Sequence, residues 1–373
     1  MRNTGAQSLV ILRIQRKVRQ MRRGGAAGGR AVAVGLIVVV AVAVTVALLT
    51  FAAVSRSSSS GGGSRVAGPP VLTPSLEPLD PATGPASGTV VRSGIPFGPP
   101  KLPRALYGEM FTGTKLAVTP DSAVDELNEA RSESMRVFVI LVGSQGNYKS
   151  SDGTFDIDRW KSVVDEFGDV DFTEFVADGT IVGHQLVSEA KARAQWGGSV
   201  ISNNVLDEMA RYSKEIWPTM PTVLRTDPSD LEEHAAAFGT PWPGWKWRYL
   251  DAASARYLVR KGRVEDFAAN EQASARRQRL ALVTGLNVLS GGDGSSGIPS
   301  PRRGRWAMSP DELRRYGSAM LLETTPCAFE LWRYETPGSA FEDVVYFRQP
   351  EINEVVLELA AIASRRPARL CRR

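Results

Sequence analysis

The sequence predicts an α/β protein: a (β/α)8 TIM-like barrel preceded by one transmembrane helix and a disordered linker. Three observations lead to this expectation. Residues 31–54 form a charge-free apolar run, residues 55–101 are rich in Ser, Gly and Pro, and short apolar runs alternate with helical patterns from residue 102 to the end at 373. Such alternation is typical of βα units that build a parallel sheet.

The N-terminal 54 residues are expected to hold the protein in a membrane. Residues 1–30 form a basic cytoplasmic leader with eight Arg or Lys residues and no acidic residue. About 20 apolar residues suffice to cross a bilayer as a helix, and the basic flank places the N-terminus in the cytoplasm. A cleaved signal peptide is the alternative, but the run exceeds the usual apolar core of about 7–15 residues, so we favour a retained signal-anchor. We therefore expect a single-pass protein of the cell membrane with an extracytoplasmic C-terminal domain.

The composition of the rest of the chain limits its partners. Residues 55–101 contain few large apolar side chains and are expected to form an extended stalk. Beyond the leader the chain has 37 basic and 40 acidic residues, so its basic excess belongs to the membrane flank. A nucleic-acid-binding body would carry that excess on its folded part, and we expect no nucleic-acid partner.

The barrel is expected to occupy residues 102–373. The predicted strands are residues 106–111, 136–142, 180–187, 222–225, 247–251, 280–289 and 328–334, with a short eighth strand at 319–323. The predicted helices are residues 120–134, 157–167, 202–217, 228–236, 263–277, 309–320 and 350–364. A barrel of this kind usually has about 250 residues. A doubly wound open sheet is the runner-up, but the first βα turn lacks the nucleotide-binding fingerprint that such folds carry.

Neither a metal nor a cofactor is expected. His184 and His234 with Cys327 and Cys371 do not match a zinc-site spacing, and neither histidine has a Ser or Cys nucleophile at motif distance. An exported protein could join Cys327 to Cys371 in one disulfide, and two free thiols are an equal alternative.

Carboxylates at the predicted strand ends are the candidate catalytic residues, because a barrel places its site there. These are Glu189, Asp251 and Glu330. The candidate substrate-binding residues are Glu109, Trp196, Arg225, Tyr249, Asn287 and Trp332. Carboxylates that converge beside Trp and Tyr suit glycoside chemistry, in which one acid protonates the leaving oxygen and a second acts as nucleophile or base. The alternative is that each carboxylate caps a helix or pairs with an Arg; Glu330, in mid-strand, is slightly favoured to be paired and structural.

The segments 171–190, 203–225 and 327–335 resemble the TIM-barrel, glycosidase-like domains of bacterial exported proteins, and the resemblance covers residues 102–364. In those relatives the strand before a Trp-Gly-containing loop ends in Asp-Glu-Pro, whereas this chain has Ser188-Glu189-Ala190. The resemblance implies a glycoside hydrolase superfamily whose activities are largely unassigned.

Three functions follow as hypotheses. The leading one is a carbohydrate-active protein of the cell envelope, glycoside hydrolase-like, with Glu189 as acid/base and Asp251 or Glu330 as its partner. The altered residues around Glu189 favour a second, a glycan-binding module without turnover. The third is a structural barrel ectodomain, since fold does not dictate function.

Overall fold

The computed structural model describes residues 94–108, 110–237, 246–300, 304–332 and 346–373. The chain divides into two compact units, Met1–Thr83 and Gly84–Arg373, and all described residues belong to the second. The basic leader, the apolar run at 31–54 and most of the expected linker therefore lie outside the described residues. Within the described ranges, no helix combines the length and the apolar character that a membrane span requires.

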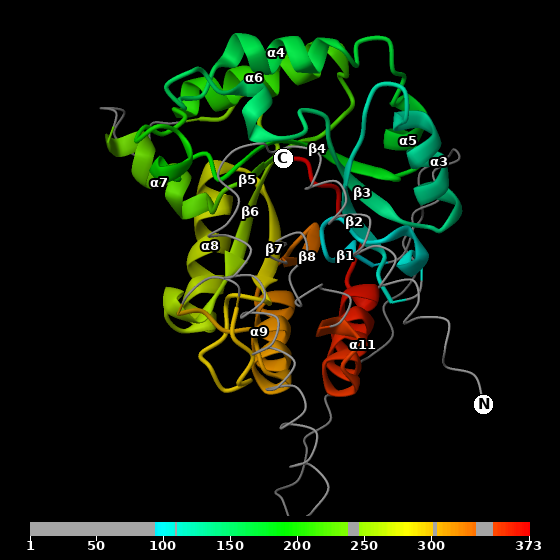
Figure 1. Ribbon diagram of the computed structural model, residues 1–373, viewed down its shortest axis with the longest axis vertical. Helices are drawn as coiled ribbons and strands as arrows, with labels where there is room; N and C mark the ends of the chain where they lie inside the picture. Colours follow the sequence, from blue (N-terminus) through cyan, green and yellow to red (C-terminus); the bar gives the residue numbers. More distant parts are fainter. Residues whose placement is uncertain (1–93, 109, 238–245, 301–303, 333–345) are drawn as a thin grey trace, which may run out of the picture. The chain divides into compact units, whose positions relative to one another are not determined.

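The described unit is built on an eight-stranded parallel sheet with the order β1-β8-β7-β6-β5-β4-β3-β2 (Figure 1). Its strands are β1 (Phe97–Gly98), β2 (Gly113–Ala117), β3 (Arg136–Ile140), β4 (Ile181–Ser188), β5 (Thr222–Arg225), β6 (Ala252–Tyr257), β7 (Ala281–Asn287) and β8 (Ala328–Trp332). Strands β3 to β7 each pair in parallel with the strands that precede and follow them in the chain. This is the succession that repeated βα units produce.

Strand β1 closes the sheet into a barrel. Phe97 pairs with Phe329 of β8, and Thr112, the residue before β2, donates its backbone N–H to the Phe97 carbonyl oxygen at 2.9 Å. Glycine is required at position 98, because a Cβ there would lie 2.2 Å from the carbonyl oxygen of Gly113. The predicted (β/α)8 barrel is thus confirmed by the order and closure of its strands.

Helices cover the outside of the barrel (Figure 1). They are α3 (Ala123–Ser132), α4 (Ile157–Asp165), α5 (Thr173–Ala177), α6 (Asn203–Ile216), α7 (Pro228–Ala237), α8 (Val264–Gln278), α9 (Pro310–Leu322) and α11 (Pro350–Arg365). Several begin at side chains that cap their free N–H groups. Asp156 accepts from the second and third N–H groups of α4, Ser202 accepts from Val205 in α6, and Ser309 forms a capping box with Glu312 in α9.

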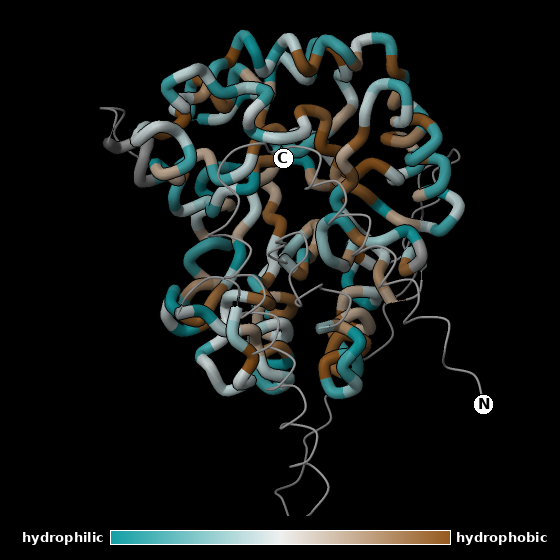
Figure 2. Tube along the Cα trace, in the orientation of Figure 1, coloured by the Kyte–Doolittle hydropathy of each residue, from teal (hydrophilic) through white to brown (hydrophobic). Residues whose placement is uncertain are grey.

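Strand residues alternate between two apolar clusters, as a period of two requires. The smaller cluster lies inside the barrel and takes from the strands Phe138, Val223, Ala252, Val283 and Ala328. The larger cluster lies between strands and helices and includes Val137, Leu224, Ala253, Leu282 and Phe329. In Figure 2 hydrophobic residues follow the strands, whereas hydrophilic residues recur along the outer helices. The barrel interior is therefore apolar near the amino ends of the strands.

A disulfide between Cys327 and Cys371 closes this amino end. The two Cα atoms are 5.2 Å apart, and both residues are buried. Cys327 immediately precedes β8, and Cys371 packs in the interior cluster with Phe138 and Val223. The C-terminal residues after α11 thus return to the strands, as the red segment in Figure 1 shows, and of the two thiol alternatives the structure has the disulfide.

Three predicted strands are wrong. Residues 104–106 form a 3-10 turn at the start of the predicted strand 106–111, and the strand of this unit is β2 at Gly113–Ala117. The predicted strand 247–251 is a connection that precedes β6 (Ala252–Tyr257). The predicted strand 319–323 lies mostly in α9, and the additional strand is β1. The other five strands agree to within about three residues at either end.

The helices agree with the sequence pattern more closely. Each predicted helix has a counterpart in the structure, and α5 (Thr173–Ala177) was not predicted. The barrel also begins earlier than the expected boundary at Leu102, since β1 at Phe97–Gly98 belongs to the sheet.

Candidate functional site

Two cavities open where the strands end at their carboxyl side. One measures about 310 Å³ and the other about 460 Å³, and both are lined by Arg225 of β5 and Trp332 of β8. The first also reaches Lys115 and Tyr148, and the second also reaches Glu189 and Arg256. Volumes of about 300–1,000 Å³ are usual for small-ligand sites, and this end of a barrel is where such sites form.

Glu189 follows the last residue of β4 in a left-handed conformation, with φ of 54°. This conformation is unfavourable for a residue with a Cβ, by about 1–2 kcal/mol, and persists only where neighbours fix it. The Glu189 N–H donates to the Arg225 carbonyl oxygen at 2.8 Å, and the Trp196 indole N–H donates to the Glu189 carbonyl oxygen at 3.0 Å. These bonds hold the backbone and fix where the carboxylate lies.

Cations from two neighbouring strands hold the Glu189 carboxylate. Its Oε1 lies 3.1 Å from an Arg225 nitrogen and 3.0 Å from an Arg256 nitrogen, and its Oε2 accepts from the Gln195 amide at 2.7 Å. The group therefore joins β4, β5 and β6 at their carboxyl ends. Charge-assisted hydrogen bonds of this kind are about twice as strong as neutral ones.

Arg225 is the most deeply buried cation of this group, with 7% of its side chain exposed. Burial, followed by repulsion from Arg256, lowers the pKa of Arg225 to about 9. Its guanidinium carbon lies 3.9 Å from the centre of the Trp332 ring, and that of Arg256 lies 4.7 Å from the same centre. Both guanidinium groups are thus fixed against one aromatic side chain.

A second ion pair lies deeper in the barrel. Lys115 of β2 and Glu330 of β8 approach to 2.9 Å, and both are almost fully buried. Burial lowers the pKa of Lys115 to about 8, and the Glu330 charge opposes this shift. The pair confirms the expectation that Glu330 is matched with a cation.

Several buried polar atoms in this part of the barrel have no hydrogen-bond partner among the described residues. They come from five different strands and are Gln185 Oε1, Arg225 Nε, Ser254 Oγ, Asn287 Oδ1 and Glu330 Oε2. Buried polar atoms are nearly always satisfied in folded proteins, by protein groups, water or a ligand. A cluster of them beside two cavities is the arrangement that a polar ligand would complete.

The structure brings together five of the nine residues expected at the site. Glu189, Arg225, Asn287 and Trp332 line the larger cavity, and Glu330 lies below them. The predicted face of β8 is also confirmed, with Ala328 in the interior cluster, Glu330 next and Trp332 at the cavity.

Asp251 and Tyr249 lie at the opposite end of the barrel. Asp251 directly precedes β6, and its carboxylate accepts from the N–H of Thr222, the first residue of β5, and pairs with Lys214 at 2.6 Å. Tyr249 lies in the same connection. The expected meeting of Glu189 with Asp251 does not occur, because the strand begins after Asp251 and does not end at it.

Of the remaining candidates, Trp196 is fully buried beneath the site, where its ring packs with Tyr148 and Phe155. Its part in the site is the hydrogen bond to Glu189, with no exposed face to offer a sugar. Glu109 lies outside the described residues. His184 is buried, stacks on Trp160 and bonds to Ser213, in agreement with a structural role.

Lys115 and Arg256 are site residues that the sequence did not predict. Both belong to strands that were placed wrongly, β2 and β6. Once the strands are located, the spacing of residues shows which side chains share a face. Lys115 lies two residues after Gly113, and Arg256 lies four residues after Ala252, so each pair shares a strand face.

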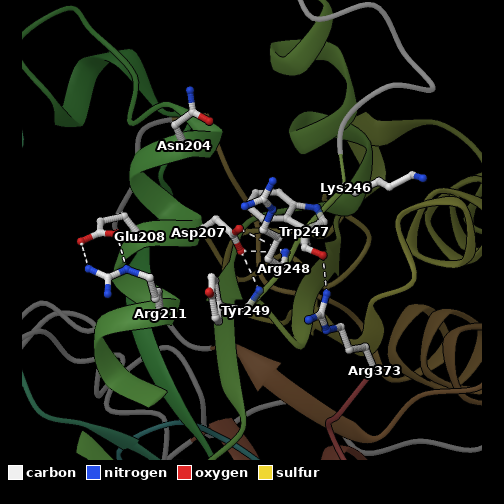
Figure 3. A pocket seen from close by; sticks show the side chains of 9 residues that line it. All are labelled: Asn204, Asp207, Glu208, Arg211, Lys246, Trp247, Arg248, Tyr249 and Arg373. Atoms are coloured by element: carbon white, nitrogen blue, oxygen red, sulfur yellow. Dashed lines mark hydrogen bonds and ion pairs between the residues drawn. The ribbon is translucent and has the colours of Figure 1, made fainter. Parts of the chain in front are cut away.

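A cavity of about 880 Å³ lies elsewhere (Figure 3). Its polar groups are already used within the protein. Asp207 accepts the backbone N–H groups of residues 248–250, Glu208 pairs with Arg211, and Arg373 donates to the Trp247 carbonyl oxygen. It therefore offers fewer unsatisfied groups than the carboxyl end of the barrel. In the described part of the chain, no group of three or more His, Cys, Asp or Glu side chains is placed to hold a metal ion.

No family model and no curated protein sequence matches the chain. Among solved structures it is similar to a GH113 β-1,4-mannanase, with 11% identity and a TM-score of 0.46 over 72% of this chain and 99% of the other. It is similar to a β-glucanase from Saccharophagus degradans in complex with cellotetraose, with 9% identity and a TM-score of 0.46 over 73% and 88%. A D-psicose 3-epimerase matches with 10% identity and a TM-score of 0.41 over 72% and 97%.

The barrel fold that the resemblance implied is confirmed by the order of the strands and by the pairing of β1 with β8. At TM-scores below 0.5 the matches carry no argument about activity. The barrel assignment rests on the strand order, and the chemistry must be argued from the side chains of the site.

Proposed function

We propose that this protein is a carbohydrate-active barrel that binds a glycan in the cavities at the carboxyl ends of its strands. The observation that supports this most strongly is the position of Glu189 in the larger cavity, beside Arg225, Arg256 and Trp332. Sugars present many hydroxyl groups, and the unsatisfied polar atoms of Gln185, Ser254 and Asn287 are suited to bond them.

Hydrolysis would use Glu189 and Glu330. Glycoside hydrolysis needs two carboxyl groups, one that exchanges a proton with the leaving oxygen and one that attacks the sugar or activates water. Glu189 would serve as the carboxylate of the pair, since its Oε1 accepts a hydrogen bond from Arg256 and forms an ion pair with Arg225. Glu330 has Oε2 without a partner among the described residues, and this hypothesis uses it as the second carboxyl group.

Glycan binding without turnover is the second candidate. Glu189 and Glu330 are both paired with cations, and Asp251, the other expected partner, lies at the far end of the barrel. Under this alternative the ion pairs maintain the shape of the cavity, and neither Glu189 nor Glu330 acts as the acid.

We also propose that residues 31–54 anchor the protein in the cell membrane with the barrel on the extracytoplasmic side. The support is the charge-free apolar run behind a basic leader. A disulfide in the barrel suits an oxidising compartment.

The test is binding and turnover by the full-length protein against neutral and acidic polysaccharides, with Glu189→Gln alongside. The matched control is Glu208→Gln, since Glu208 is also held by two cations and is similarly exposed, 31% against 29%. Turnover that is lost in Glu189→Gln and kept in Glu208→Gln would support hydrolysis. Binding without turnover in all three proteins would favour the second candidate, and absence of both would refute the proposal.

A further inference from the structure

Among the described residues, the ion pairs of the site leave a local surplus of positive charge around Arg225 and Arg256. Lys115 is balanced by Glu330, and Lys261 at the rim of the larger cavity is balanced by Asp227. Glu189, in contrast, is shared by Arg225 and Arg256. One carboxylate thus faces two guanidinium groups.

This surplus charge lies in a poorly hydrated place. Arg225 is more than nine-tenths buried, lines both cavities, and its Nε has no hydrogen-bond partner among the described residues. An uncompensated buried charge is destabilising, and a buried donor without a partner adds to the penalty. An anion bound in the cavity would balance the positive charge and could accept a hydrogen bond from Arg225 Nε.

Cations outnumber carboxylates among the described lining residues of both cavities. The larger cavity is lined by five cations, Lys191, Arg225, Arg256, Arg260 and Lys261, and by three carboxylates, Glu189, Asp227 and Asp230. The smaller cavity is lined by Lys101, Lys115 and Arg225, with no acidic side chain among its described lining residues. The two cavities share Arg225 and Trp332 and are together called the recess; its described lining is predominantly positive, although the chain beyond the leader is slightly acidic.

Resting on the proposed function, we infer that the ligand of this recess is an acidic glycan whose sugar rings carry a singly charged oxyanion, bound by Arg225 and Arg256. The planar donors of a guanidinium group match the oxygens of a carboxylate or a sulfate. A uronic acid and a sulfated sugar share this chemistry. The Trp332 ring holds both guanidinium groups in position to meet it.

The experiment compares glycans that differ only in charge. Polygalacturonate is tested beside its methyl ester, and carrageenan beside desulfated carrageenan, by affinity electrophoresis of the full-length protein in detergent at low and high salt. We expect at least one acidic form to bind about tenfold more tightly than its neutral form, because hydrogen bonds to charged groups are stronger, and we expect salt to weaken that binding. The pair that responds distinguishes a carboxylate from a sulfate.

Arg256→Gln should reduce the preference, lowering affinity for the acidic form about tenfold more than affinity for the neutral form. Arg256 is chosen because it is less buried than Arg225, and Arg314→Gln on α9 is the control for loss of a paired arginine away from the site. Equal affinity for charged and neutral forms would overturn the inference and leave the proposed function standing. Failure of every glycan to bind would overturn both.

Discussion

Glu189 and Arg225 are joined twice, once through their backbones and once through their side chains. The Glu189 N–H donates to the Arg225 carbonyl oxygen at 2.8 Å, and the Arg225 guanidinium lies 3.1 Å from Glu189 Oε1. The end of β4 is thereby fixed to the end of β5, and the left-handed backbone of Glu189 is held in place. The candidate carboxylate is positioned by the fold itself.

Trp196 is expected to position Glu189 through its hydrogen bond. Trp196→Phe should lower the free energy of unfolding by about 1 kcal/mol, the usual worth of one neutral hydrogen bond, and should also weaken glycan binding. The matched control is Trp217→Phe, because the Trp217 indole also donates to a backbone carbonyl, that of Val170, far along the chain from the site. Urea unfolding and glycan binding are measured on both. Equal loss of binding in the two variants would contradict a positioning role for Trp196.

Removal of one partner of the Lys115–Glu330 ion pair is expected to destabilise the protein strongly, whereas replacement of both partners by apolar residues is expected to destabilise it little. Lys115→Met leaves a buried carboxylate alone and should destabilise the protein by about 3–5 kcal/mol. The double variant Lys115→Met, Glu330→Leu should recover most of that loss. Urea unfolding of the two variants is the measurement. A double variant no more stable than the single one would show that the pair is needed for the barrel to fold.

His184 is expected to make stability fall in acid. Burial lowers the pKa of His184 from 6.5 to about 3. Between these two pH values the imidazole is therefore protonated in the unfolded chain and neutral in the folded protein. Stability is therefore retained above pH 6.5 and lost as the pH falls toward 3, by roughly 3 kcal/mol at about pH 4. Urea midpoints of the wild type and His184→Asn across this range give the difference. If the stability of the wild type and of His184→Asn fell in parallel as the pH is lowered, His184 would contribute nothing to the loss of stability in acid.

The disulfide is expected to stabilise the barrel by closing its amino end. Cys327 and Cys371 are 44 residues apart, and closing a loop of that length in the unfolded chain contributes about 4 kcal/mol in the chain-entropy account. Unfolding in urea with and without a reductant measures it, with Cys327→Ala, Cys371→Ala as the variant that a reductant cannot affect. An unchanged midpoint on reduction of the wild type would contradict this role.

The sequence predicted strands well where an apolar run was bounded by turn residues. β5 at Thr222–Arg225 was placed correctly, whereas β1 is two residues long and β6 is built from small side chains, AASARY, that signal a strand weakly. The aromatic run at 247–251 resembled a strand more. It is a connection because Asp207 of α6 accepts its N–H groups in place of a neighbouring strand.

The same limits explain the site. Glu189, Arg225 and Trp332 could be predicted because their strands were identified and the carboxyl ends of barrel strands carry the site. Lys115 and Arg256 could not, since β2 and β6 were misplaced. The sharing of Glu189 by two arginines depends on distances between separate strands, which no local pattern records.

The central claim is that the carboxyl-end recess, and not the larger cavity of Figure 3, is the glycan site. The most direct test measures glycan binding in Arg256→Gln and, as its counterpart in the other cavity, in Arg248→Gln. The account predicts that Arg256→Gln weakens binding about tenfold and that Arg248→Gln leaves it unchanged. Weakened binding in Arg248→Gln with unaltered binding in Arg256→Gln would contradict it.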